Sequence, residues 1–234
     1  MKILVITSGT GAKAVQAARP LALEDFRRGP EHVQREIAAR GPEVVAAEDL
    51  YAGDQHRLLM EGVRRFRQAA ATDTHRSLDL HIVSPGYGVV PGERRVAPYD
   101  VSFRRLNPDE LSERSNFVGI PAAIQGVLSS TFDVAFLLLG RPYLAACELS
   151  PALELGGPTF AFGGGEAARA LPPIPRLKPV PVGLSEAAAF RCPLFRLKGK
   201  IVGGWLTKLS QDPGSLNGLL AGALDPVTGW SEPS

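Results

Sequence analysis

Four short and mostly apolar runs, each ending abruptly at glycine or a small polar residue, constrain the fold of this chain most strongly. They span residues 3–6, 80–83, 134–139 and 159–162. Apolar runs without polar alternation suit strands that are covered on both faces, as in a parallel sheet. We therefore expect these four runs to form the centre of one sheet.

Helical patterns separate the apolar runs. Residues 54–71 place apolar side chains on one side and charged ones on the other, which is typical of an amphipathic helix. Asn107 and Pro108 indicate the start of another helix, which we expect to reach about Leu128 with a break near residues 119–121. This alternation predicts an α/β fold with a mainly parallel sheet flanked by helices.

The last third of the chain differs in composition. Residues 171–182 contain five prolines, which excludes a helix or a central strand and predicts an extended edge segment. Between residues 167 and 224 there are eight Lys or Arg and two Asp or Glu, so positive charge gathers here and a basic helix is expected.

A chain of 234 residues suits one compact body, which we place at residues 1–211, with 212–234 as a loosely attached C-terminal tail. Only two cysteines are present and the four histidines lack metal-ligand spacing, so we expect no disulfide, no metal and a cytoplasmic location. No apolar run is long enough to span a membrane, so no membrane partner is expected.

In an open α/β sheet, ligands bind where the strands end and helix N-termini begin. The segments that follow the four runs would bring hydroxyls, backbone donors and one guanidinium to that edge, a lining that suits a phosphate, a sugar or a base edge. The alternative is that these residues only terminate strands. The candidate ligand-binding residues here are Thr7, Ser8, Thr10, Ser84, Tyr87, Arg141 and Tyr143.

Residues 9–14 match the outline G-x-G-x-x-A of a dinucleotide-binding loop. The acidic residue expected about 20 positions later is missing, and Pro20 interrupts the helix that should follow. We therefore expect no nicotinamide or flavin cofactor. Lys13 either meets an anion at this loop or lies solvated on a first helix.

Two tyrosines stand beside carboxylates, Tyr51 near Asp49 and Tyr99 next to Asp100. A tyrosine can stack on a base and bond a phosphate or sugar, and a buried carboxylate can act as a general base. Such residues also commonly pack and cap loops. The motifs of serine hydrolases, P-loop NTPases and zinc proteases are absent from the sequence, which disfavours those classes.

The sequence resembles the YaaA family of peroxide-stress proteins over residues 1 to about 106. The resemblance rests on Tyr51-Ala52-Gly53, on the run ending in Ser84-Pro85-Gly86-Tyr87-Gly88, on Pro98-Tyr99, and on an opening strand that ends in Ser8 and is followed by Lys13. Near residue 203 a glycine stands where that family has an arginine. The resemblance implies a DNA-binding protein that limits oxidative damage and has a positively charged groove. The residues carried over are Ser8, Lys13, Tyr51, Ser84, Tyr87, Gly88 and Tyr99.

Three functions remain open. The first is DNA binding, with phosphates contacted by basic residues, for which binding should weaken with salt. The second is an enzyme that hydrolyses or transfers an N-glycosidic bond in a nucleotide, nucleoside or damaged base, with Ser84, Tyr87 and Asp100 as catalytic residues. The third is an interaction protein without a small-molecule site. The candidate nucleic-acid contacts are Arg94, Arg95, Arg104, Arg105, Lys198 and Lys200.

Overall fold

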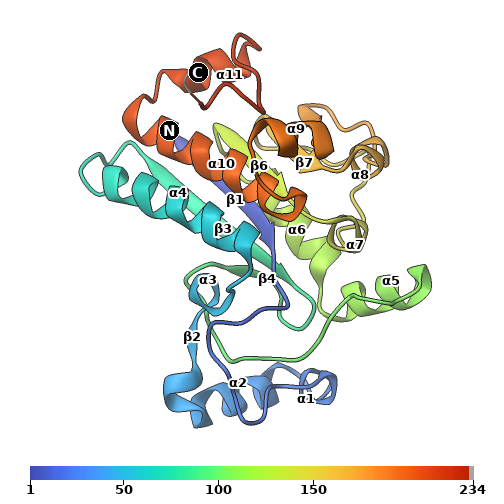
Figure 1. Cartoon of the computed structure of the whole chain (residues 1–234). Helices are drawn as coiled ribbons and strands as arrows, with labels where there is room; N and C mark the ends of the chain where they lie inside the picture. Colours follow the sequence, from blue (N-terminus) through green and yellow to red (C-terminus); the bar gives the residue numbers. More distant parts are fainter. Residues whose placement is uncertain (232–234) are drawn as a thin grey trace.

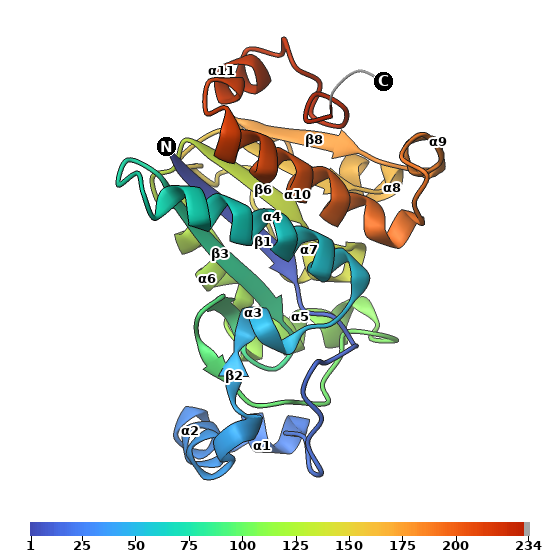
Figure 2. The ribbon, with the colours of Figure 1, turned by 60° about the vertical axis from the view of Figure 1, so that its left-hand side comes forward.

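The computed structural model describes residues 1–231, and its centre is a six-stranded sheet of order β4-β3-β1-β6-β7-β8 (Figures 1 and 2). Neighbouring strands run parallel except β3 and β4, which form an antiparallel hairpin. The four predicted runs are the contiguous strands β3, β1, β6 and β7, which confirms the mainly parallel sheet. The strands are β1 (Lys2–Ser8), β3 (Ser77–Ser84), β4 (Gly88–Pro91), β6 (Val134–Leu138), β7 (Thr159–Gly163) and β8 (Leu177–Pro181).

Two long helices, α4 (Asp54–Ala70) and α10 (Leu194–Gln211), lie side by side over one face of the sheet (Figure 2). Their apolar sides bury Phe66 and Trp205 against the strands. The two helices approach closely because glycines stand at their contact: a Cβ on Gly203 would lie 2.4 Å from the carbonyl oxygen of Leu58. The predicted amphipathic helix over residues 54–71 is confirmed by α4.

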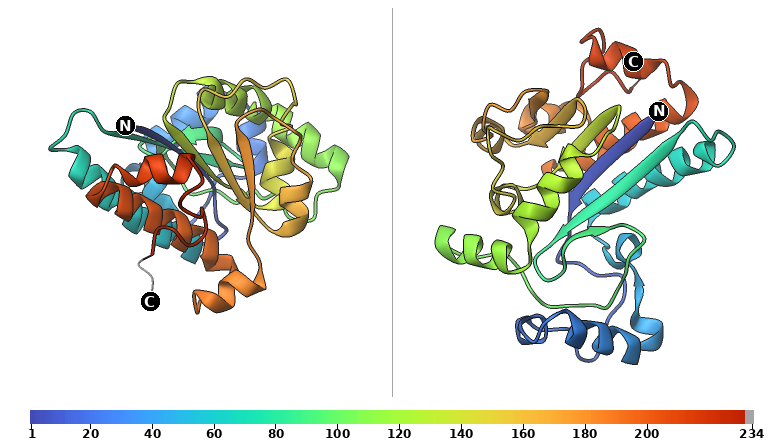
Figure 3. Two further views of the ribbon diagram at one scale, coloured as in Figure 1. Left: turned by 90° about the horizontal axis from the view of Figure 1, so that it is seen from above. Right: turned by 180° about the vertical axis from the view of Figure 1, so that it is seen from behind.

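The opposite face is covered by α6 (Ile120–Ser129) and α7 (Arg141–Ala146), against which α5 (Pro108–Phe117) packs, and Figure 3 shows α6 lying across this face in the view from behind. The Asn107 side chain accepts the Glu110 N–H, so α5 begins at the predicted cap. Gly119 has a φ of 70°, a left-handed conformation that ends one helix and caps the next, and the predicted break is confirmed.

A small lobe lies beyond the carboxyl ends of β1 and β3 (Figure 1). It has its own apolar cluster around Leu21, Phe26 and Leu50. Its elements are α1 (Leu23–Arg27), α2 (Pro30–Ala39), a 3-10 turn (Gly41–Glu43), β2 (Val45–Ala46), α3 (Ala47–Leu50) and β5 (Arg95–Val96), and β2 pairs with β5.

The segment after β1 is not helical, contrary to the first helix considered for Lys13. Its backbone bonds instead to the segment near Tyr51: the Ala14 N–H donates to the Leu50 carbonyl, and the Ala52 N–H donates to the Ala12 carbonyl. Lys13 itself forms an isolated bridge with Tyr51. These long-range bonds satisfy the backbone groups that a helix would have paired locally.

The last third contains α8 (Gly165–Arg169), the edge strand β8, α9 (Leu184–Ala189) and the basic helix α10, so the proline-rich edge segment and the basic helix are confirmed. Residues 212–231 differ from the loosely attached tail that composition predicts. They include α11 (Ser215–Leu220), which buries Leu219 in the core, and the Trp230 ring stacks on Phe190 with 5.4 Å between centroids. Apolar side chains spaced through this segment give it a packing face. Within the described residues, no helix has the length and apolarity that a membrane span requires.

Candidate functional site

The carboxyl ends of β1 and β3 meet at the edge of the sheet that faces the lobe. Ser8 pairs in register with Val83, and the Gly9 N–H donates to the Val83 carbonyl at 2.9 Å. On the other side of β1, Thr7 pairs with Leu138 of β6. Parallel neighbours therefore bring the first two candidate loops together at one edge, as expected for an open α/β sheet.

A buried chain of hydroxyls lies at this edge. The Ser84 hydroxyl donates to the Tyr99 hydroxyl at 2.9 Å, and the Tyr51 and Tyr99 hydroxyls are 3.0 Å apart. The Ser84 oxygen also accepts the N–H groups of Gly86 and Tyr87, at 3.3 and 3.1 Å. Since the proton and both lone pairs of Ser84 are engaged, this side chain positions Tyr99 and the turn after β3.

Two further tyrosines fasten loops through their hydroxyls. The Tyr87 hydroxyl bonds both the N–H and the carbonyl of Ala97, each at 3.0 Å, and the Tyr143 hydroxyl donates to the Gly9 carbonyl at 2.8 Å. Burial is the main cause that raises the pKa of Tyr51, Tyr87, Tyr99 and Tyr143 well above 10, so all four stay neutral near pH 7.

Lys13 lies against the faces of two of these rings. Its ammonium nitrogen is 4.5 Å from the centroid of Tyr51 and 4.3 Å from that of Tyr99, and it donates to the Thr10 carbonyl at 2.6 Å. Burial lowers the pKa of Lys13 to about 8, and the negative charge of Asp100 opposes this shift. An amine with such a pKa is partly uncharged at neutral pH and can exchange a proton with a ligand.

The remaining residues of the edge differ in access. Asp100 is exposed, Ser8 and Thr10 are half-buried, and the Thr10 hydroxyl accepts the Gly53 N–H at 3.2 Å. The buried Thr7 hydroxyl has no hydrogen-bond partner within residues 1–231. Gly88 is required by the backbone, because its φ is +76° and a Cβ would lie 2.4 Å from the Val118 carbonyl oxygen.

The basic candidates divide into two sets. Arg94, Arg104 and Arg105 are exposed, and Arg95 is exposed but also donates to the Val44 carbonyl. By contrast, the Lys198 ammonium donates to the Leu139 carbonyl at 3.1 Å. The Lys200 ammonium donates to the Phe190 carbonyl at 2.8 Å, and Arg141 pairs with Glu166 at 3.0 Å on the surface. Burial also lowers the pKa of Lys198 to about 8. The two α10 lysines therefore bond main chain in this conformation.

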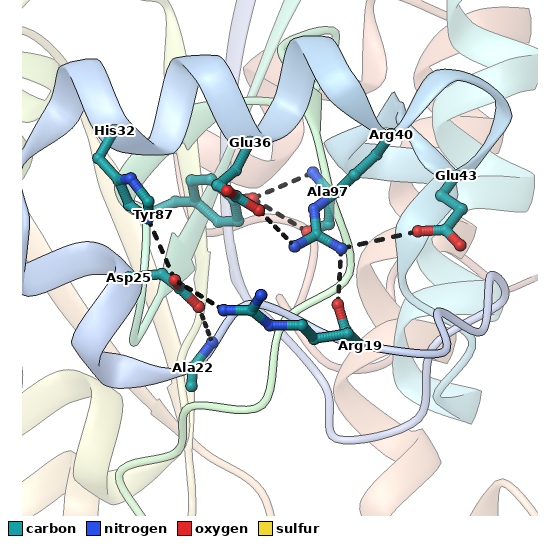
Figure 4. A network of polar contacts seen from close by, with 9 residues as sticks. All are labelled: Arg19, Ala22, Asp25, His32, Glu36, Arg40, Glu43, Tyr87 and Ala97. Atoms are coloured by element: carbon teal, nitrogen blue, oxygen red, sulfur yellow. Dashed lines mark hydrogen bonds and ion pairs between the residues drawn. The ribbon is translucent and has the colours of Figure 1, made fainter.

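An acid–imidazole pair, which no pattern in the sequence indicates, lies in the lobe (Figure 4). The Asp25 carboxylate is buried, accepts the Ala22 N–H at 2.9 Å and lies 3.1 Å from the His32 ring nitrogen. The Ala22 hydrogen bond is the main cause that lowers the pKa of Asp25, and His32 and Arg19 add to it. Asp25 and His32 lie on consecutive helices joined at Gly29, whose φ is +93°. The contact therefore does not follow from the residue spacing of a single helix or strand.

The same figure shows Arg40 joining three parts of the lobe. Its guanidinium donates to the Glu36 carboxylate at 2.9 Å and to the Arg19 carbonyl at 2.6 Å, and it lies 3.8 Å from Glu43. Together with the Asp25 pair, these contacts hold α2 over the segment that precedes α1. The network therefore stabilises the part of the lobe that lies next to Tyr87.

Comparison of the sequence with protein-family models and with curated proteins finds no match.

Proposed function

We propose that this protein is an enzyme that acts on the N-glycosidic bond of a nucleotide, nucleoside or damaged base at the edge formed by β1 and β3. The observation that carries the proposal is Lys13, whose amine lies over the Tyr51 and Tyr99 rings and near the Asp100 charge. A lysine that served only as a phosphate contact would gain from remaining fully charged and exposed. Desolvation that brings its pKa to about 8 suits proton transfer instead.

The chemistry would divide between the two charged groups. Asp100 would accept a proton from water as the water oxygen attacks the sugar carbon, and the Lys13 ammonium would give its proton to the departing base. The net reaction consumes one water and yields the free base and a sugar with a hydroxyl in its place, which keeps any phosphate or strand that it carried. Tyr51, Tyr99 and Ser84 would act as positioning residues, because they hold the rings on which the amine lies.

The test measures release of free base from the four ribonucleoside monophosphates and from DNA with a damaged base. We expect Asp100→Asn and Lys13→Met each to abolish release, with circular dichroism showing intact folding. Lys13→Arg should remove the alkaline limb of the pH–rate profile, which we expect near pH 8, because a guanidinium keeps its proton. Full activity of both Asp100→Asn and Lys13→Met would refute this mechanism.

A second candidate is a DNA-binding protein of the YaaA kind that protects against oxidative damage. The favouring observation is that exposed arginines lie near the same edge. Arg104 is one of them: its charge acts on Tyr143, whose hydroxyl bonds Gly9 after β1, and opposes the rise in the pKa of Tyr143 that burial causes. A DNA titration at several salt concentrations tests it. Affinity should fall steeply with salt, and Arg104→Gln with Arg105→Gln should flatten the slope by about one unit per lost contact. A flat salt response in the unaltered protein would exclude phosphate-driven binding.

A further inference from the structure

A hollow adjoins the tyrosine cluster under Lys13 at Tyr87. It is a cleft of about 230 Å³ between α2, the turn from β3 to β4, and the end of α5. The Tyr87 ring lines the cleft and also meets the Tyr99 ring edge-to-face, with 5.4 Å between centroids. One ring therefore belongs to the wall of the cleft and to the tyrosine cluster under Lys13.

The walls of the cleft are held by close backbone contacts. A Cβ on Gly86 would lie 2.7 Å from the ring of Phe26, so the turn rests directly on that ring. Phe26 in turn meets Tyr87 edge-to-face at 5.0 Å between centroids. On the other side, Gly88 lies against the Val118 carbonyl. The cleft is thus built before any ligand arrives, which reduces the ordering cost of binding.

Its lining combines a flat apolar surface with a free positive charge. Phe117 is 48% exposed, although a ring of this size is usually buried in a core. Arg94 lines the same cleft, and within residues 1–231 its guanidinium forms no hydrogen bond or ion pair. Gln34 adds an exposed amide. A purely apolar ligand would leave the arginine unused, and a simple anion would leave the rings unused.

We propose that this cleft binds one nucleotide, with its base against Phe117 and Phe26 and its phosphate on Arg94. Aromatic rings stack on every base, an amide can bond a base edge, and a guanidinium matches a phosphate. The volume is below the range of about 300–1,000 Å³ typical for larger ligands, so it suits one base rather than a dinucleotide. This inference takes the class of substrate from the proposed function, and it adds to that function the place at which the base is held.

Calorimetric titration with the four ribonucleoside monophosphates and with ribose 5-phosphate tests the assignment. We expect at least one nucleotide to bind more tightly than ribose 5-phosphate. Phe117→Ala should weaken nucleotide binding about tenfold through lost stacking. Arg94→Gln should weaken it by a similar factor and leave binding of the matching nucleoside unchanged. Phe195→Ala is the control, because Phe195 is another exposed phenylalanine, on α10 and outside the cleft, and it should change nothing.

Further arms separate this inference from the proposed enzyme. Lys13→Met should lose base release but keep nucleotide affinity and its dependence on Phe117. Nucleotide binding that depends on Phe117 in a protein without base release would support the cleft and refute the proposed reaction. A short single-stranded oligodeoxynucleotide that binds where mononucleotides do not, again with dependence on Phe117, would identify the base as part of a strand. Binding of every probe unchanged by both Phe117→Ala and Arg94→Gln, or no binding of any probe at millimolar concentration, would overturn the assignment.

Discussion

Replacement of Lys13 by methionine should change how stability depends on pH. In the folded protein burial lowers the pKa of Lys13 to about 8, whereas the exposed value is 10.5. Between these values the unfolded chain still holds a proton that the folded chain has released, so the free energy of unfolding rises with pH. Because the pKa of Lys13 is lower in the folded protein than in the unfolded chain, the buried ammonium destabilises the folded protein. This destabilisation is full below about pH 8 and disappears above about pH 10.5. Linkage gives a rise of about 1 kcal/mol between pH 7 and pH 9 from this lysine alone.

The assay is urea denaturation of the unaltered protein and Lys13→Met at several pH values between 7 and 9. The buried Lys198 titrates in both proteins and cancels in the difference, and the range stops before the tyrosines ionise. We expect the stability of the unaltered protein minus that of the variant to increase by about 1 kcal/mol across this range. Lys178→Met, which removes an exposed lysine on β8, is the control and should give a flat difference. A flat difference for Lys13→Met would refute the argument that this amine is desolvated.

Three further substitutions test the packing, each by chemical denaturation. Gly203→Ala should lower the free energy of unfolding by about 1–3 kcal/mol, because the new methyl group would overlap a carbonyl of α4. Gly126→Ala is the control: its methyl group would meet nothing within 4 Å, so it should be neutral or stabilising. Equal effects of the two substitutions would contradict the close contact between α4 and α10. Leu219→Ala should cost about 2–5 kcal/mol, and no loss would mean that residues 212–231 are loosely attached after all. Tyr99→Phe should cost about 1–3 kcal/mol because it strands two buried hydroxyls, and a stabilised variant would refute that hydrogen-bond chain.

The parts of the fold that could be predicted are those whose cause is local in the sequence. The four apolar runs became the central strands, and Asn107 and Gly119 set the start and the break of the next helices as their chemistry requires. The segment at residues 212–231 could not be predicted, because glycine and proline indicate loops but do not reveal whether apolar residues among them find a partner. There Trp230 packs on Phe190 and against Gly204, contacts that only the folded chain creates.

The candidate site shows the same limit. The order of Tyr51, Ser84 and Tyr99 in the resemblance placed them at one site, and their hydroxyls lie in one hydrogen-bonded chain. The resemblance also carried over Lys13, but it did not indicate that the amine would lie over two of the rings. That contact needs the segment after β1 to leave helical geometry and pair with residues near position 51. The acid–imidazole pair of the lobe was missed for a similar reason.

Charge counting located the positive residues correctly along the chain but not in space. Of the eight cations between residues 167 and 224, Arg176, Arg196, Lys198 and Lys200 bond to groups of the protein itself. The exposed arginines Arg94 and Arg104 come from the first 106 residues, and the exposed Arg141 follows β6, so all three lie outside that basic segment. The proposed nucleotide phosphate lies on Arg94, whereas Arg104 is a proposed DNA contact, so Arg104→Gln should weaken DNA binding. Turnover also separates the two functions, since loss of Lys13 or Asp100 should stop an enzyme and leave a phosphate-driven DNA binder with its salt dependence intact.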